Sequence, residues 1–202
     1  RWHYAEAREE FRALVAARKF VYDARWQIAL ISLRKIRDNP TEAREMLDYV
    51  RKVGGPHKEE AYYLTVRSYM REERYDEALK VADAYEKLYP EGEHIEILQY
   101  YRAWLPFDHN DCKKAIPRFT AFVKDYESRR SLSLGFRAWC YVRMEKWPQA
   151  WHAYGALLGF GNTIVRGKAH YWRAVAADKM GKRDMGLREL QTLHKLYPLT
   201  YY

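Results

Sequence analysis

The sequence contains few of the residues that catalytic and metal-binding motifs require. Its two cysteines, Cys112 and Cys140, show no metal-ligand or redox spacing. Its seven histidines show no zinc-binding helix spacing, and no serine lies in a nucleophile elbow. The segment 159–161 lacks the further glycine and the preceding strand of a phosphate-binding loop. The sequence therefore predicts no catalytic residue, metal or cofactor in this chain, and it leaves both free buried thiols and a disulfide open.

Long apolar runs and strand-like alternation are also missing. No stretch of 18 or more apolar residues occurs, so no membrane-spanning helix is predicted. No segment alternates apolar and polar residues over the length of a strand. Since 48 % of the residues are hydrophobic and 16 % are aromatic, the chain still has enough apolar material for a core between helices.

A period of about 36 residues runs through the whole chain. The expected helices form hairpins of two, and a small residue near the start of the second helix of each hairpin marks the period. Successive markers are 36, 35, 37, 35 and 36 residues apart. Tetratricopeptide units have a period of about 34 residues. The pattern therefore predicts an α-solenoid of tetratricopeptide-like helical hairpins. The markers are Ala7, Ala43, Ala78, Ala115, Ala150 and Gly186.

Turn residues agree with this phase and predict an all-α chain of about eleven helices. Asn39-Pro40 and Gly181, for example, separate amphipathic runs. Pro117 falls inside the seventh expected helix, where we expect a bend or a later start. The helices are expected near residues 2–19, 22–37, 41–53, 57–72, 75–88, 93–105, 111–126, 129–144, 147–158, 163–180 and 183–196. The repeats, forming one array over 1–202, are expected near 1–19 (partial), 22–53, 57–90, 93–127, 129–160 and 163–198.

Positive charge is concentrated in the second half of the chain. Residues 1–110 hold 19 basic and 20 acidic residues, whereas residues 111–202 hold 17 and 7, which gives net charges of −1 and +10. A one-sided basic surface attracts anions such as nucleic acid, anionic lipid or a polyanionic wall polymer. The alternative is an ordinary solvated surface, because Lys and Arg suit exposed helix faces.

Candidate binding residues follow from the expected geometry of the hairpins. In tetratricopeptide-like stacks the first helix of each hairpin lines the concave surface. Aromatic rings there stack on sugars or bases, and cations pair with carboxylates or phosphates. Packing between helices is the alternative role for each aromatic residue. The glycan-binding or partner-binding candidates are Tyr63, Arg67, Tyr101, Trp104, Trp139, Arg143, Lys168, Tyr171, Trp172 and Lys179, with Arg25 and Arg71 on the same face.

The last third of the chain resembles one known family. Residues 168–172 read Lys-Ala-His-Tyr-Trp and residues 197–202 read Tyr-Pro-Leu-Thr-Tyr-Tyr. Both resemble the end of the superhelical domain of bacterial soluble lytic murein transglycosylases, and the run 101–104 looks like a repeat of that family. The resemblance implies a periplasmic, non-catalytic scaffold that positions peptidoglycan glycan strands. The catalytic domain would follow Tyr202 or belong to a partner, and the tail would pack against it.

The chain alone is not predicted to be an enzyme, although the resemblance implies that its parent protein is a transglycosylase. That family uses a Glu followed by Ser, but the residues after Glu127-Ser128 do not continue the family's catalytic motif. Because the chain starts with Arg1 inside a second helix, we expect it to be a piece of a longer protein. The alternative function is a generic tetratricopeptide protein-interaction scaffold in the cell envelope. Nucleic acid is disfavoured, since no side-chain pair repeats as a base-reading code requires.

Overall fold

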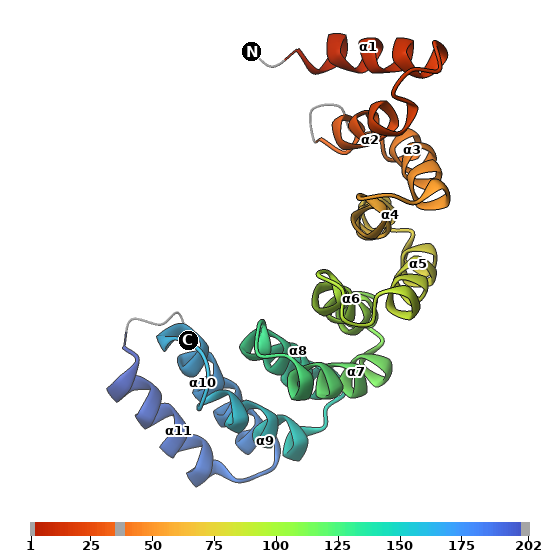
Figure 1. The fold of residues 1–202 in the computed structure, drawn as a ribbon. Coiled ribbons are helices and arrows are strands. Elements are labelled where there is room, and N and C mark those ends of the chain that lie inside the picture. Colours follow the sequence, from red (N-terminus) through yellow and green to blue (C-terminus); the bar gives the residue numbers. More distant parts are fainter. Residues whose placement is uncertain (1–2, 35–38, 199–202) are drawn as a thin grey trace. The chain divides into compact units, whose positions relative to one another are not determined.

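The computed structural model describes residues 3–34 and 39–198, and within them the chain forms eleven helices and no strand (Figure 1). The predicted all-α fold and the number of helices are thereby confirmed. The helices are α1 (Tyr4–Ala16), α2 (Val21–Ser32), α3 (Pro40–Val53), α4 (Lys58–Arg71), α5 (Tyr75–Leu88), α6 (Ile95–Asp108), α7 (Cys112–Asp125), α8 (Arg130–Arg143), α9 (Trp147–Leu157), α10 (Thr163–Lys179) and α11 (Arg183–Leu196).

The helices divide into two compact units, Arg1–Leu98 and Gln99–Tyr202, and the boundary lies inside α6. Each helix packs against the next one along the chain from α1 to α5 and from α7 to α11. The repeat markers Ala43, Ala78, Ala115 and Ala150 are fully buried. A Cβ on the last marker, Gly186, would lie 3.1 Å from the carbonyl oxygen of Ala174. The small residues that define the period are therefore small because neighbouring helices approach closely there.

The turn inside each of four successive hairpins ends the first helix in the same way. Glu73, Asn110, Glu145 and Gly181 all have a positive φ, between 54° and 72°. In each case the next amide N–H donates to a carbonyl five residues back, as Lys182 does to Ala177 over 2.9 Å. This is the Schellman arrangement, in which a left-handed residue follows the helix and the free carbonyls of the last turn are satisfied. The four turns repeat at intervals of 37, 35 and 36 residues.

Proline residues interrupt helices less than the sequence analysis expected. The sixth helix continues to Asp108 through Pro106 instead of ending near residue 105. Pro106 has no amide hydrogen, so the carbonyl oxygen of Arg102 loses its helical partner, and Nη1 of Arg118 donates to that oxygen over 2.8 Å. Pro117 lies inside α7. The helix is not delayed by it, since Cys112 already begins it after Asp111 accepts from the Lys114 amide over 3.1 Å.

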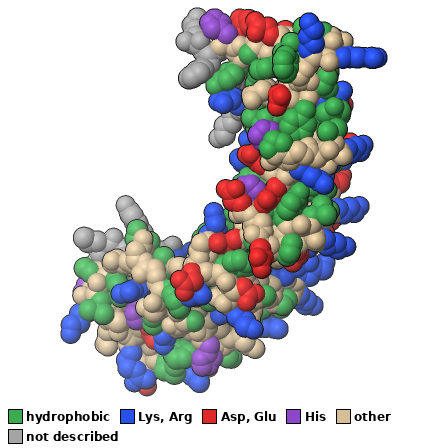
Figure 2. Space-filling model, in the orientation of Figure 1, with side chains coloured by type: hydrophobic (Ala, Val, Ile, Leu, Met, Phe, Trp, Pro, Cys, Tyr) green, Lys and Arg blue, Asp and Glu red, His purple; other side chains and the backbone are tan. Residues whose placement is uncertain are grey.

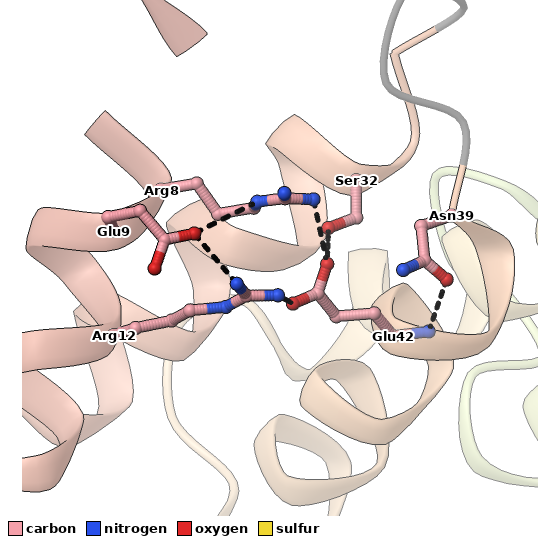
Figure 3. Close-up of polar contacts among 6 residues, drawn as sticks. All are labelled: Arg8, Glu9, Arg12, Ser32, Asn39 and Glu42. Carbon is pink, nitrogen blue, oxygen red and sulfur yellow. Dashed lines mark hydrogen bonds and ion pairs between the residues drawn. The ribbon is translucent and has the colours of Figure 1, made fainter. Parts of the chain in front are cut away.

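The first helix is held to α2 and α3 by a polar cluster around Glu42 (Figure 3). Arg8 donates to Oε2 of Glu42 over 3.2 Å, Arg12 donates to Oε1, and the Ser32 hydroxyl donates to Oε2 over 2.7 Å. Burial raises the pKa of Glu42, but the bonds from Ser32, Arg12 and Arg8 outweigh it and the pKa is lowered. Since no residue of α1 is fully buried, this charged cluster carries a large part of its attachment.

A second polar cluster fixes the start of α6. Oε1 of Glu59 accepts from the Tyr85 hydroxyl over 2.6 Å and from the Glu93 amide over 2.8 Å, while the Tyr85 hydroxyl accepts from the His94 amide over 2.9 Å. Burial and Glu59 raise the pKa of the fully buried Tyr85. A Cβ on Gly92 would lie 2.2 Å from the Tyr85 hydroxyl oxygen. Glycine at this position therefore lets the loop close over the cluster.

Cys112 and Cys140 are buried free thiols. Burial and the neighbouring Cys112 raise the pKa of Cys140.

Most of the transglycosylase-like end of the chain, residues 199–202, lies outside the described residues. Of that end, Tyr197 packs its ring 5.6 Å from the ring of His170, centroid to centroid. The expectation that the tail packs against a further domain therefore stays a prediction.

A candidate binding groove on the first helices of the second unit

A groove of about 740 Å³ opens on the first-helix side of the second unit. It lies between α8 and α10, with the end of α6 at one edge. The floor is mainly apolar, and the basic residues gather near the start of α8. The lining residues are Phe107, Glu127, Arg129, Arg130, Ser131, Leu132, Gly135, Phe136, Trp139, Tyr154, Leu157, Val165, Lys168 and Trp172.

Two clusters of aromatic rings form the floor of the groove. Trp139 and Trp172 meet edge to face with centroids 4.8 Å apart, and Trp172 lies parallel to the buried Tyr154 at 6.2 Å. Phe107 and Phe136 lie 4.5 Å apart at the other end. The two contacts of Trp172, edge to face and parallel, are geometries that aromatic pairs prefer. Because the two indole rings contact each other and Tyr154, the floor is preformed and part of its aromatic surface is already covered.

The cations of the groove differ in what they contact. Arg130 donates to the Val123 carbonyl over 3.1 Å and forms an ion pair with Glu127 at 3.4 Å. Arg129 places its guanidinium 5.4 Å from the centre of the Tyr100 ring. Lys168 is exposed and forms no hydrogen bond or ion pair with any residue in 3–34 or 39–198. The Lys168 ammonium is therefore the cation of this groove that is ready to pair with an incoming anion.

Gly135 keeps the centre of the groove open. It lies in the second turn of α8, and a Cβ there would meet nothing within 4 Å. Glycine in a helix interior costs about 1 kcal/mol relative to alanine. The structure thus has space above the helix at this position that a side chain would fill.

Three of the predicted binding residues come together in this groove, namely Trp139, Lys168 and Trp172. Arg143 lies at its edge, where Nη1 donates to the Phe107 carbonyl over 3.1 Å and the guanidinium lies 4.7 Å from the centre of the Phe107 ring. Tyr171 faces the other side of α10, where it lines small cavities with residues of α11. Lys179 is exposed at the end of α10. Their binding roles remain predictions.

The remaining candidates lie outside the groove. Tyr63 stacks on His94 with centroids 4.1 Å apart, and Arg67 lies over Tyr63 at 5.6 Å, both in the first unit. Tyr101 and Trp104 are half-buried on α6 and do not line the groove.

The two further residues of the expected inner face also contact their own unit. Arg25 lies over the Tyr49 ring at 4.1 Å, and Arg71 donates to the Leu33 carbonyl. Arg71 and Arg143 thus perform the same task in the two units, since each is the last residue of a first helix and holds the end of the preceding first helix.

Sequence analysis missed the aromatic and glycine residues that share the face of Trp139. Phe136 and Gly135 precede Trp139 by three and four residues, so they lie on the same side of α8. Helical spacing from Trp139 would have found both of them. Phe107 had no such signal, because the sixth helix was expected to end before it.

The comparison with known proteins agrees with this architecture. Residues 32–93, from the end of α2 to the loop before α6, match the tetratricopeptide repeat family. No curated protein sequence matches the chain.

Solved structures of tetratricopeptide-like fold resemble most of the chain. MamA residues 41 to the end, from Desulfovibrio magneticus RS-1, has a TM-score of 0.63 at 16 % identity and covers 90 % of this chain and 97 % of that chain. A MamA RS-1 ArsTM double mutant has a TM-score of 0.64 at 16 % identity, covering 87 % and 93 %. BtubC (BKLC) from P. vanneervenii has a TM-score of 0.60 at 12 % identity, covering 96 % and 87 %. These likenesses show the fold, an all-α array of tetratricopeptide-like hairpins.

Within residues 3–34 and 39–198, no group of three or more His, Cys, Asp and Glu side chains is placed to hold a metal ion. No helix in that part of the chain combines the length and apolar character needed to cross a bilayer.

Proposed function

We propose that this chain is a helical-repeat scaffold that binds a segment of a partner protein in the groove between α8 and α10. The observation that carries the proposal is the groove itself: an open, preformed aromatic floor beside an exposed lysine that has no partner in the described chain. Apolar pockets with a few placed polar groups are the usual form of binding sites. The match of residues 32–93 to the tetratricopeptide repeat family and the fold both support an interaction role.

The chemistry of the groove indicates what the bound segment contains. Apolar side chains fit over Trp139 and Trp172, because burying them removes apolar surface from water. An acidic side chain fits beside Lys168, which can pair with a carboxylate. Glu127 is the acidic lining residue, and it is paired with Arg130. We therefore propose a partner segment with an apolar anchor next to an acidic residue.

Peptide display on the immobilised chain tests this function. We expect the enriched sequences to contain that apolar and acidic pair. Their affinity should fall at least about tenfold for Trp139→Ala, since central aromatic residues of an interface contribute about 2 kcal/mol or more. Lys168→Glu should weaken acidic peptides selectively. Arg166→Glu is the matched control, because Arg166 is exposed on the same helix and does not line the groove. Enrichment that survives Trp139→Ala and Lys168→Glu would contradict a groove-based function.

A second candidate occupant is a glycan strand, which is what the transglycosylase resemblance implies. Two indole rings and a free ammonium in one groove favour it, since tryptophan faces stack on sugar rings. The mutual contact of Trp139 and Trp172, and the contact of Trp172 with Tyr154, leave less open ring surface for a sugar. In this candidate the chain works in the periplasm and positions peptidoglycan for a catalytic domain. The support for it is the sequence resemblance, and the fold fits both candidates.

Soluble peptidoglycan fragments separate the two candidates. A glycan scaffold is expected to bind a disaccharide-peptide fragment and to quench the fluorescence of Trp139 and Trp172. A peptide scaffold is expected to bind the displayed peptides and leave the fluorescence unchanged on addition of the fragment.

A further inference from the structure

In the second unit, several of the second helices of the hairpins, and the turns before them, carry exposed basic residues that the proposed function does not use. These are on α7 and α11 and in the turns before α9 and α11, on helices that do not line the groove. None of them forms a hydrogen bond or an ion pair with a residue in the described parts of the chain. They are Lys113, Lys124, Lys146, Lys182, Arg183, Arg188 and Lys195. Figure 2 shows Lys and Arg side chains along the edge of the second unit where these helices lie.

Exposed acidic residues do not balance these cations. On the same helices and turns, the exposed acidic residues are Asp125, Glu145 and Asp184. Asp111 is paired with Lys114 at 2.9 Å, and Glu189 is paired with Arg173 at 2.8 Å. An unneutralised patch of this kind attracts polyanions.

The first unit offers the contrast. There α5, the second helix of its hairpin, exposes Asp76 and Asp83 together with Lys80 and Lys87. Negative and positive charges therefore balance on this helix. Lys87, Lys124 and Lys195 occupy the same position, the thirteenth residue, of helices α5, α7 and α11. The repeat is thus the same in both units, while the charge around this lysine differs.

The terminal helix adds apolar surface to the basic patch. Leu187 and Leu190 are 48 % and 43 % exposed, and they share one stripe of α11 with Arg183 and His194, because these four residues follow a spacing of four, three and four. Arg188 and Lys195 lie beside this stripe. Aliphatic side chains flanked by Lys and Arg are the pattern of a helix that lies in the interface of an anionic membrane.

Nucleic acid fits the patch less well. Proteins that bind single strands stack bases on exposed aromatic rings. Among the described residues of the second unit, Phe160 is the one aromatic residue classed as exposed, and it lies in the loop after α9. Charge therefore favours a phosphate-bearing surface, and the exposed leucines favour one with an apolar interior.

We propose that the exposed surface of α11 docks on an anionic lipid membrane, with Leu187 and Leu190 at the acyl boundary and Arg188 and Lys195 on the headgroups. This surface is separate from the groove, so the chain can hold a partner segment while it lies on the membrane. The contact is peripheral. Its strength falls with salt, since exposed charges are screened over about 8–10 Å near physiological ionic strength.

Sedimentation with vesicles tests the proposal on the whole chain. We expect binding to vesicles of phosphatidylglycerol and phosphatidylcholine and not to phosphatidylcholine alone. The variant Arg188→Glu with Lys195→Glu should lower the partition coefficient at least tenfold, because one basic residue near an anionic surface contributes about fivefold. The matched control is Lys80→Glu with Lys87→Glu on α5, which makes the same change in net charge. It should bind within about twofold of the unmodified chain.

Four results would overturn the proposal. Equal loss in both double variants would show a response to net charge alone and not to this surface. Equal binding to both kinds of vesicle would remove the anionic partner, and tighter binding to double-stranded RNA than to vesicles would replace the membrane by a nucleic acid. The variant Leu187→Ser with Leu190→Ser should also weaken vesicle binding, and unchanged binding would contradict insertion. Circular dichroism of every variant establishes that it is folded.

Discussion

At the scale of single residues, the left-handed position after each first helix decides how well a hairpin closes. Glycine adopts a positive φ without steric cost, whereas other residues are strained there. Gly181 meets this requirement, but Glu73 and Glu145 occupy the same position with φ of 57° and 54°. The turn therefore depends on its hydrogen bonds more than on its sequence. The expected helix bounds leave both glutamates between helices, although no residue there signals a left-handed conformation as Gly181 does.

This strain gives a prediction for two variants of opposite sign. Gly181→Ala should lower the free energy of unfolding by about 1 kcal/mol, although a Cβ there would meet nothing within 4 Å. Glu145→Gly should raise it by up to about 1 kcal/mol for the same reason. Urea denaturation measures both. If Gly181→Ala left the free energy of unfolding unchanged, the turn would relax to a different φ at no cost.

At the scale of elements, α1 shows how much an element can owe to one carboxylate. The pKa of Glu42 lies below its ordinary value in the folded chain. A lowered folded pKa means that the stabilisation is fully present above the unfolded value, about 4.3, and is lost as the pH falls through the folded value. Acid should therefore release α1 before it unfolds the helices that have buried apolar faces.

The variant Glu42→Gln tests the attachment of α1 at neutral pH. It removes the negative charge of Glu42, with which both Arg8 and Arg12 pair. Hydrogen bonds to charged groups contribute about 1.5–3 kcal/mol. We expect faster hydrogen exchange of the α1 amides at pH 7, and little further loss of α1 protection between pH 5 and pH 3 once intrinsic rates are corrected. The variant Glu9→Gln is the control, since Glu9 is exposed and, among the described residues, forms ion pairs with Arg8 and Arg12 alone. Unchanged protection of α1 in Glu42→Gln would show that apolar contacts suffice.

Elements also show where sequence reasoning succeeds and where it stops. The helices and the hairpin period could be predicted because small residues, caps and apolar spacing recur at fixed offsets. The continuation of α6 past Pro106 could not, because it depends on Arg118 reaching the freed carbonyl of Arg102 from another helix. Within the groove, Trp139 and Trp172 followed from the phase of their helices. Arg143 lies at the edge of the groove, and its contact with Phe107 depends on where α6 ends.

At the scale of the whole molecule, the repeat fold predicts that damage stays local. In such folds each hairpin contacts only its neighbours. Phe119→Ala and Leu47→Ala each remove a fully buried side chain, one from each unit, and should cost about 3–5 and 2–5 kcal/mol. We expect Phe119→Ala to speed hydrogen exchange in α7 and α8 while α2 and α3 stay protected. Leu47→Ala should give the reverse pattern. Uniform loss of protection in both variants would show one cooperative unit.

The arginines that end α4 and α8 have a consequence for how such an array changes in length. Arg71 reaches back to Leu33, and Arg143 reaches back to Phe107, in each case one full hairpin earlier. A duplication or deletion of a complete hairpin keeps this pairing, because the new neighbours meet with the same spacing. An insertion of part of a hairpin moves the guanidinium away from its carbonyl and leaves a helix end unsatisfied. The array is thus free to grow or shrink during evolution, but only in steps of a whole repeat.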